Sequence, residues 1–267
     1  MPQEEIMPKF AANLTMLFTE VPFMERFAAA RDAGFSAVEY LFPYEFEPAE
    51  LKAQLVQNRL TQVLFNLPCG KWEEGERGIA ANPERVEEFR AGVAKAVEYA
   101  RELGAGGLNC LAGKRISGYD DDKHWSTLAG NVRFAAKVLQ GKGLRLMVEP
   151  INHFDIPGFF LNRTDQALKL IDAAGMPNVF VQYDVYHAQR EEGELASKLH
   201  NHIDKIGHIQ IADNPGRHQP GTGEINYRFI FKEIDASGYM GHVGLEYVPV
   251  PDSKTSFGWI TEFGYKL

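Results

Sequence analysis

Four short apolar runs in the second half of the chain each end in a residue that can bind a metal ion through oxygen. The closing residues are Glu149, Asp184, Gln210 and Glu246. Three carboxylates and one amide are the kind of oxygen ligands that Mg²⁺ and Mn²⁺ prefer in proteins, and they suit Zn²⁺ less well. We therefore predict that these four residues hold one divalent metal ion and that the chain is an enzyme.

Each of these residues also has a plainer interpretation. Glu149 or Glu246 alone could be a solvated carboxylate at the end of a strand, and Asp184 could cap the helix that follows it. Both glutamates, however, end runs that would otherwise bury them, and a buried carboxylate needs a compensating cation or proton. His187 follows Asp184 closely, and we expect it to contact the substrate or to support the metal ligands.

Two polar loops supply candidate contacts for an anionic substrate. Residues 214–227 follow Gln210 directly, and Arg217 in this loop could clamp a carboxylate through two parallel hydrogen bonds. Residues 70–78 resemble a lid, with Lys71 and Arg77 as candidate anion contacts. The alternative for both loops is an ordinary solvated connection.

Strand-like and helix-like segments alternate along the chain, and these segments must position the four residues. Apolar runs predict strands at residues 9–14, 37–40, 61–65, 106–110, 144–149, 179–184, 206–210 and 242–246. Helical spacing and caps predict helices at residues 22–33, 48–58, 83–103, 122–139, 164–174, 192–202 and 226–236, with 261–267 as a final helix or tail.

Eight such units predict an α/β fold, a single closed (β/α)₈ TIM barrel, in which the strand ends and the active site share one face. The alternative is an open, doubly wound sheet. That fold usually has a glycine-rich phosphate turn after its first strand, and Asn13-Leu14-Thr15-Met16 is not one.

The composition narrows the class of protein further. The net charge of -8 argues against a nucleic-acid partner, and no stretch is apolar enough for a membrane span. Cys69 and Cys110 have no CxxC partner, so we expect neither a zinc site nor a disulfide scaffold. We expect residues 1–8 to be an N-terminal extension without a secretory signal and residues 9–267 to be the catalytic domain of a cytoplasmic protein. An assembly of identical chains remains open.

Several motifs together resemble the hydroxypyruvate isomerase family of xylose-isomerase-like TIM barrels. They are Phe65-Asn66-Leu67-Pro68, Gly75-Glu76-Arg77-Gly78, Glu149-Pro150-Ile151-Asn152, Asp184-Val185-Tyr186-His187, His208-Ile209-Gln210-Ile211-Ala212-Asp213 and Pro220-Gly221-Thr222-Gly223-Glu224-Ile225-Asn226-Tyr227. The resemblance extends from about Lys9 to Glu246 and does not include residues 250–267.

The resemblance implies a divalent metal and a pair of glutamates that move the proton, here Glu149 and Glu246. It implies that Asp184 and Gln210 complete the metal site and that His187 and Arg217 hold substrate oxygens. Sugar-epimerase relatives usually have a histidine where this chain has Gln210, which makes a keto-sugar 3-epimerase a weaker alternative.

The expected reaction is the interconversion of hydroxypyruvate and tartronate semialdehyde (2-hydroxy-3-oxopropanoate) by metal-assisted proton transfer through an enediolate. The substrate carboxylate would be bound by Arg217, Lys71 or His187. A four-carbon substrate, 2-oxo-tetronate (2-dehydrotetronate), fits the same motifs. The alternative from another class is a sugar-acid-binding barrel without catalysis. No nucleotide-cofactor motif is present.

Overall fold

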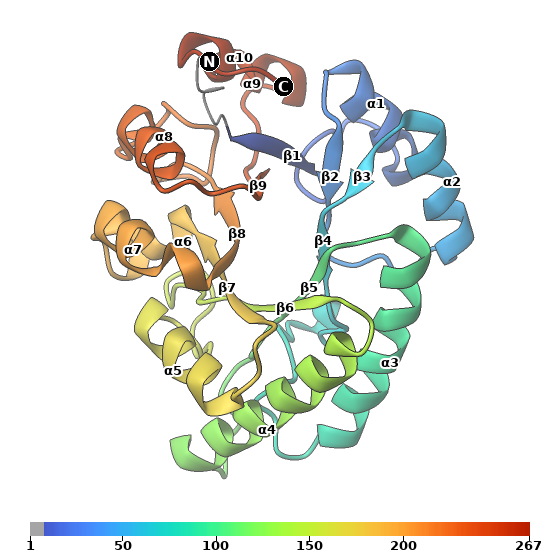
Figure 1. Ribbon diagram of the computed structural model, residues 1–267, viewed down its shortest axis with the longest axis vertical. Helices are drawn as coiled ribbons and strands as arrows, with labels where there is room; N and C mark the ends of the chain where they lie inside the picture. The colour runs from blue at the N-terminus through green and yellow to red at the C-terminus, as the bar shows by residue number, and fades with distance from the viewer. Residues whose placement is uncertain (1–7) are drawn as a thin grey trace.

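The computed structural model describes residues 8–267, and the predicted extension therefore lies outside the described residues except for Pro8. A ring of parallel strands is surrounded by helices (Figure 1). This arrangement confirms the predicted (β/α)₈ barrel. None of the helices in the described part of the chain combines the length and the apolar character that a membrane crossing needs.

The strands of residues 8–267 pair in the order β3-β2-β1-β9-β8-β7-β6-β5-β4, and neighbouring strands pair in parallel. They are β1 (Lys9–Asn13), β2 (Ala37–Glu39), β3 (Thr61–Gln62), β4 (Leu64–Asn66), β5 (Gly107–Cys110), β6 (Arg145–Val148), β7 (Val179–Asp184), β8 (Ile206–Ile211) and β9 (His242–Leu245).

The barrel closes through one interrupted strand. The sequence predicts a single strand at residues 61–65, and the structure divides it at Val63 into β3, which pairs with β2, and β4, which pairs with β5. The N–H of Val63 donates to Val38 O at 2.8 Å, and the carbonyl of Val63 accepts from the N–H of Gly106 at 3.2 Å. Val63 therefore links both neighbours, and the predicted eight barrel strands are present.

The helices cover the outside of the ring (Figure 1). They are α1 (Arg26–Asp32), α2 (Pro48–Asn58), α3 (Val86–Leu103), α4 (Asp121–Gln140), α5 (Thr164–Ala174), α6 (Val185–Glu191), α7 (Leu195–His202), α8 (Tyr227–Ala236), α9 (Ser253–Ser256) and α10 (Gly258–Glu262). Three 3₁₀ turns accompany them: η1 (Phe23–Glu25), η2 (Trp72–Glu74) and η3 (Ile203–Lys205).

Two helix predictions need correction. The predicted helix at residues 192–202 begins only at Leu195, because a separate helix, α6, starts directly after Asp184 and ends at Glu191. The expected final helix or tail at residues 261–267 is mostly tail, because α10 ends at Glu262. Helix α6 matters for the site, since its first turn carries His187.

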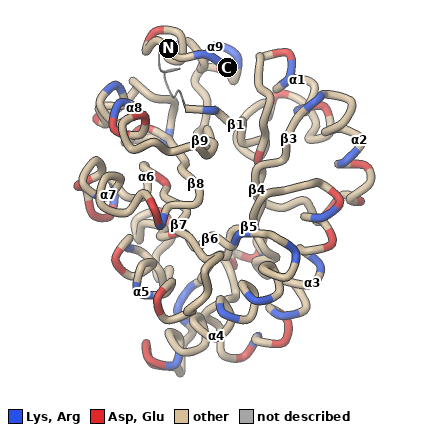
Figure 2. The backbone as a smooth tube through the Cα atoms, viewed as in Figure 1, with Lys and Arg blue, Asp and Glu red and all other residues tan. Residues whose placement is uncertain are grey.

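The helices pack on the strands through apolar faces. In α3, Phe89, Val93, Ala96 and Val97 are buried at the spacing of successive helical turns. Burying one large apolar side chain contributes about 1.5–3 kcal/mol. Lys and Arg alternate with Asp and Glu on the outer helices (Figure 2). The apolar shell thus fixes the strand ends, whose side chains build the site.

Candidate active site

The carboxyl end of the barrel carries a ring of buried polar residues. Each of the eight barrel strands has one of them within one residue of its carboxyl end: Asn13, Glu39, Asn66, Asn109, Glu149, Asp184, Gln210 and Glu246. Because all the strands are parallel, their carboxyl ends lie on one face of the barrel. A cavity of about 370 Å³ lies among these side chains, and six of the eight line it: Asn13, Glu39, Asn66, Glu149, Gln210 and Glu246. The structure therefore brings together the four residues singled out in the sequence.

Half of the ring was not predicted. Asn13, Glu39, Asn66 and Asn109 follow the same rule as the other four, since each closes a buried run such as Ala37-Val38-Glu39 or Leu64-Phe65-Asn66. The sequence pattern, a buried strand with a polar residue at its end, was present but short, because β2 and β4 have only three residues each. Their amides and Glu39 connect the predicted residues to one another.

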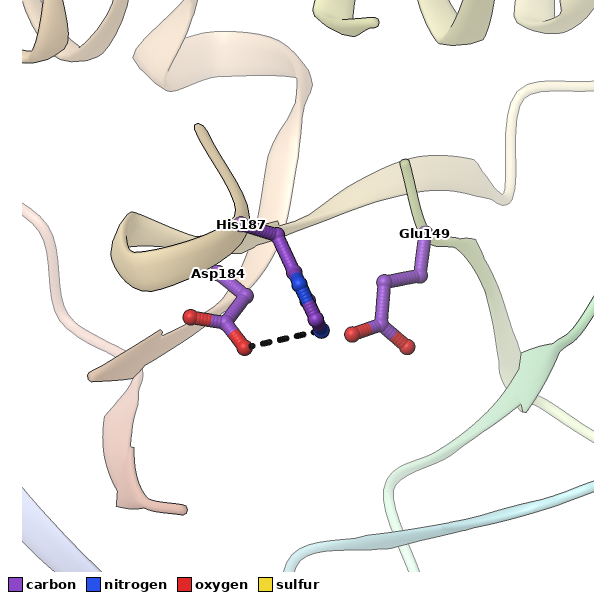
Figure 3. Close-up of side chains that lie close together, drawn as sticks. All are labelled: Glu149, Asp184 and His187. Atoms are coloured by element: carbon purple, nitrogen blue, oxygen red, sulfur yellow. Dashed lines mark ion pairs between the residues drawn. The ribbon is translucent and has the colours of Figure 1, made fainter. Parts of the chain in front are cut away.

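Glu149, Asp184 and His187 form a cluster that could hold a metal ion (Figure 3). One possible ligand atom from each lies within 4.8 Å of the other two. Asp184 ends β7 and also caps α6, because its Oδ1 accepts from the N–H of Tyr186 at 2.8 Å. Its Oδ2 is buried without a hydrogen bond in the described part of the chain, 3.6 Å from His187 Nε2. The two interpretations of Asp184 are therefore compatible.

The neighbours of His187 decide how its ring acts. The Oδ1 atom of Asn152 accepts from the N–H of Asp155 at 2.9 Å, so Nδ2 of Asn152 faces Nδ1 of His187 at 2.6 Å. Nδ1 must then accept, which leaves the proton on Nε2. In this tautomer Nε2 is a donor rather than a metal ligand. The carboxylates are therefore the groups that could hold a metal ion, and His187 could donate a hydrogen bond through Nε2.

Glu246 is held by an arginine and an amide. Arg217 Nη2 donates to Glu246 Oε2 at 2.6 Å, and the same nitrogen lies 3.7 Å from Asp184 Oδ2. Asn13 Nδ2 donates to the other oxygen of Glu246 at 3.2 Å. Glu149 is held similarly, because Asn109 Nδ2 donates to its Oε2 at 2.8 Å. Arg217 thus supplies a positive charge to this carboxylate group.

Glu39 organises the opposite part of the ring. Its Oε1 accepts from Gln210 Nε2 at 2.7 Å, and its Oε2 lies 2.7 Å from His208 Nε2. The bond to Glu39 fixes the orientation of the Gln210 amide, and Oε1 of Gln210 accepts from Gln182 Nε2 at 2.6 Å. An amide oxygen has a second lone pair, so this bond leaves Gln210 able to bind a cation as well.

The pKa values of the buried acids respond to this crowding. Burial raises the pKa of Glu149 well above its usual range, and the negative charges of Glu246 and Asp184 add to the effect. Burial also raises the pKa of Glu246 to about 8, although Arg217 opposes the shift. Burial raises the pKa of Asp184, again against Arg217. These carboxyl groups would therefore bind a cation that replaces their protons.

The remaining titratable groups agree with this assignment. Burial lowers the pKa of His187 well below its usual value, and Arg217 lowers it further, so the ring is neutral. Burial disfavours the charge of Arg217, but the attraction of Glu246 and Asp184 outweighs it and raises the pKa. The orphaned Asp184 oxygen and the oxygen-rich set fit a hard divalent cation.

The two cations of the predicted lid occupy different places. Lys71 does not line the cavity; its side chain is 66% exposed, and its ammonium group pairs with Glu74 at 3.1 Å. Arg77 does line the cavity. Of the two candidate anion contacts predicted in this loop, Arg77 therefore lies at the cavity and Lys71 does not. Arg217 and His187 both line the cavity, as expected of substrate contacts.

Comparisons with known proteins agree with the fold and with the family that the motifs resemble. The family model of the xylose isomerase-like TIM barrel matches residues 27–263. The chain is 51% identical over 257 residues to hydroxypyruvate isomerase of Escherichia coli (strain K12), covering 96% of this chain and 100% of that protein. It is 45% identical to 2-oxo-tetronate isomerase of Cupriavidus necator, covering 96% of this chain and 99% of that protein.

A solved structure is also similar over nearly the whole chain. It is described as an AP endonuclease, family 2, from Brucella melitensis, and it superposes with a TM-score of 0.93 at 42% sequence identity. The match covers 96% of this chain and 99% of that one.

Proposed function

The chain belongs to the hydroxypyruvate isomerase family of xylose isomerase-like TIM barrels, and on this premise we propose that it interconverts hydroxypyruvate and tartronate semialdehyde. The observation that carries the proposal is the pair of buried glutamates, Glu149 and Glu246, that line one cavity. Their raised pKa values suit groups that hold and release a proton.

The cofactor in this proposal is Mg²⁺ or Mn²⁺. Glu149, Asp184 and Glu246 would hold the ion through carboxylate oxygens, with the amide oxygen of Gln210 as a fourth ligand. The ion would supply positive charge that polarises the substrate carbonyl and stabilises the enediolate. The orphaned oxygen of Asp184 and the crowding of acids support this assignment.

The side chains of the protein would move and hold the protons. One of the two glutamates takes the proton from C3 of hydroxypyruvate, and a glutamate delivers a proton to C2. The oxygen on C3 loses a proton and the oxygen on C2 gains one, so no external oxidant or reductant is needed. The Nε2–H of His187 is available to donate to a substrate oxygen. Each positioned acid or base contributes roughly 10²–10⁴-fold to the rate.

The second candidate substrate is 2-oxo-tetronate. Three relatives, at 45%, 44% and 39% identity, carry the name 2-oxo-tetronate isomerase. The chemistry would be the same, because this substrate differs from hydroxypyruvate by a hydroxymethyl group on C3. A keto-sugar 3-epimerase remains a weaker alternative, because Gln210 replaces the histidine usual in those enzymes.

Partners and location follow from this proposal. We expect a small 2-oxo acid as the substrate and the cytoplasm as the site of action, with a homo-oligomer left open. We expect no nucleic-acid partner, because the net charge is -8 and phosphate binding needs a basic surface. Retention of DNA containing an abasic site at physiological salt would contradict this expectation.

A substrate panel tests the proposed function. The metal-loaded protein is incubated with hydroxypyruvate, 2-oxo-tetronate and a keto sugar, each with Mg²⁺ or Mn²⁺ and with a chelator control. We expect the highest kcat/KM with hydroxypyruvate and loss of activity with the chelator. A higher kcat/KM with 2-oxo-tetronate would favour the second candidate, and activity only on the keto sugar would overturn both.

A further inference from the structure

The cavity that receives the substrate is strongly acidic. Its lining includes the carboxyl groups of Glu39, Glu149, Asp155 and Glu246. A 2-oxo acid carries its own carboxylate, which these groups would repel unless a cation receives it. The lining contains two arginines that could receive it, Arg77 and Arg217.

We propose that Arg77, held against Trp72 in the loop between β4 and α3, binds the carboxylate of the substrate. This inference rests on the proposed 2-oxo acid substrate. Arg217 is less suited to the task, because its Nη2 is bonded to Glu246 and lies near Asp184. Moving Arg217 to the substrate would leave both carboxylates without that charge.

The guanidinium group of Arg77 has N–H donors that are not used within the described part of the protein. Its Nη1 donates to two backbone carbonyls, Trp72 O at 2.8 Å and Glu76 O at 2.7 Å. No carboxylate within the described residues forms an ion pair with it, and its hydrogen bonds there all come from Nη1, which leaves Nε and Nη2 available. A planar guanidinium with one edge fixed can offer its remaining N–H groups to both oxygens of a carboxylate.

Glu76, which precedes Arg77 in the sequence, is bonded to other groups. Glu76 pairs with Arg85, and its second oxygen accepts from the backbone N–H of Lys71 at 2.5 Å. Both oxygens of the carboxylate next to Arg77 in the sequence therefore have partners other than Arg77. The charge of Arg77 is therefore left for a ligand rather than neutralised within the loop.

The loop is built to hold Arg77 in place. The guanidinium carbon lies 4.0 Å from the centre of the Trp72 ring, which itself packs on Phe42 at 5.1 Å. Gly78, the next residue, adopts a φ of +119°, and a Cβ there would lie 2.4 Å from Leu111 O. Only glycine allows this close approach to the end of β5. Lys114 Nζ also donates to Gly75 O at 2.9 Å.

Trp72 also separates two neighbouring cavities. Together with Thr15 and Leu41 it lines both the active-site cavity and a neighbouring cavity of about 760 Å³. It is therefore part of the wall between the two cavities. With Arg77 stacked on this wall, the carboxylate end of the substrate would have a fixed position on the active-site side.

Two variants of Arg77 and one matched control test the inference. Arg77→Met removes the charge, and Arg77→Lys keeps the charge but loses the forked geometry. Lys71→Met removes a cation from the same loop outside the cavity. Binding of hydroxypyruvate is measured by calorimetry on each Mn²⁺-loaded protein, with kcat and KM measured in parallel and circular dichroism as a folding check.

We expect Arg77→Met to weaken binding and raise KM by roughly 10- to 100-fold, with a smaller effect in kcat. Arg77→Lys should recover part of the affinity, and Lys71→Met should stay within about twofold of the wild type. Equal losses in Arg77→Met and Lys71→Met, unchanged binding in Arg77→Met, or an effect on kcat alone would overturn the inference. Wild-type turnover reports separately on the proposed function, and absence of binding to the wild type would overturn both.

Discussion

Metal binding should depend steeply on pH, because the proposed ligands are protonated in the metal-free protein. Burial raises the pKa of Glu246 to about 8 and raises that of Glu149 well above its usual range. Near neutral pH these groups therefore carry protons. A carboxyl group must lose its proton before it can bind a cation, so metal binding releases protons.

The size of the effect follows from the number of protons released. Release of one proton changes the apparent affinity about tenfold per pH unit below the pKa, so between about pH 6 and pH 8 the affinity for Mn²⁺ should rise up to ~100-fold. If Glu149 and Glu246 both lose a proton, the rise is steeper. The two glutamates and Asp184 titrate together, so the measured count belongs to the group.

The stability of the metal-free protein should show the opposite trend. A folded-state pKa above the unfolded value of 4.5 means that the folded state holds the extra proton. The free energy of unfolding should therefore fall by about 1.4 kcal/mol per pH unit for each such proton as the pH rises from about 5 towards 8. Saturating Mn²⁺ should remove this fall, because the ion replaces the proton.

Titration calorimetry in two buffers of different ionisation enthalpy measures both the affinity for Mn²⁺ and the protons released. Glu246→Gln should release fewer protons than the wild type. Glu262→Gln is the matched control, because Glu262 is an exposed acid that pairs with Arg228 and does not line the cavity. Equal Mn²⁺ affinities at about pH 6 and pH 8, with no proton release, would refute the assignment of protonated ligands.

Three further predictions concern the residues that support the site. Glu39→Gln should lower Mn²⁺ affinity or kcat by about 10- to 100-fold, because Glu39 orients the Gln210 amide; unchanged values would contradict this role. Gly244→Ala should destabilise the fold by ~1–3 kcal/mol in thermal denaturation, because a Cβ would lie 2.4 Å from the Glu39 carboxylate. Gly130→Ala, in an open position of α4, is its control and should be neutral or stabilising. Asn152→Leu should reduce kcat by roughly 10-fold or more with little change in Mn²⁺ affinity, because Asn152 sets the tautomer of His187; a large loss of Mn²⁺ affinity would instead make His187 a metal ligand.

The barrel could be predicted from the sequence because its signals are long and periodic. The mostly apolar runs around Glu149, Asp184, Gln210 and Glu246 form strands of four to six residues, and most residues of these strands are buried. Parallel pairing then requires their ends to meet on one face. The comparisons confirm the family resemblance that the same motifs indicated.

The contacts within the site could not be predicted, because they depend on irregular segments. Lys71 and Arg77 lie in one loop without periodicity, and a 3₁₀ turn with Gly75 at a φ of +87° decides that Arg77 faces the cavity. The tautomer of His187 depends on Asn152, which lies 35 residues earlier in the chain. Glu39 ends a strand of only three residues, too short to give a clear alternation.

Proton transfer in D₂O tests the central claim most directly. Hydroxypyruvate is incubated with the Mn²⁺-loaded protein in D₂O, and the product is followed by NMR, in parallel with Glu149→Gln, Glu246→Gln and a chelated sample. The account predicts tartronate semialdehyde with solvent deuterium at C2, formed by the wild type and lost in each of the other samples. Absence of product from the wild type, or near-normal turnover in either glutamate variant, would contradict it.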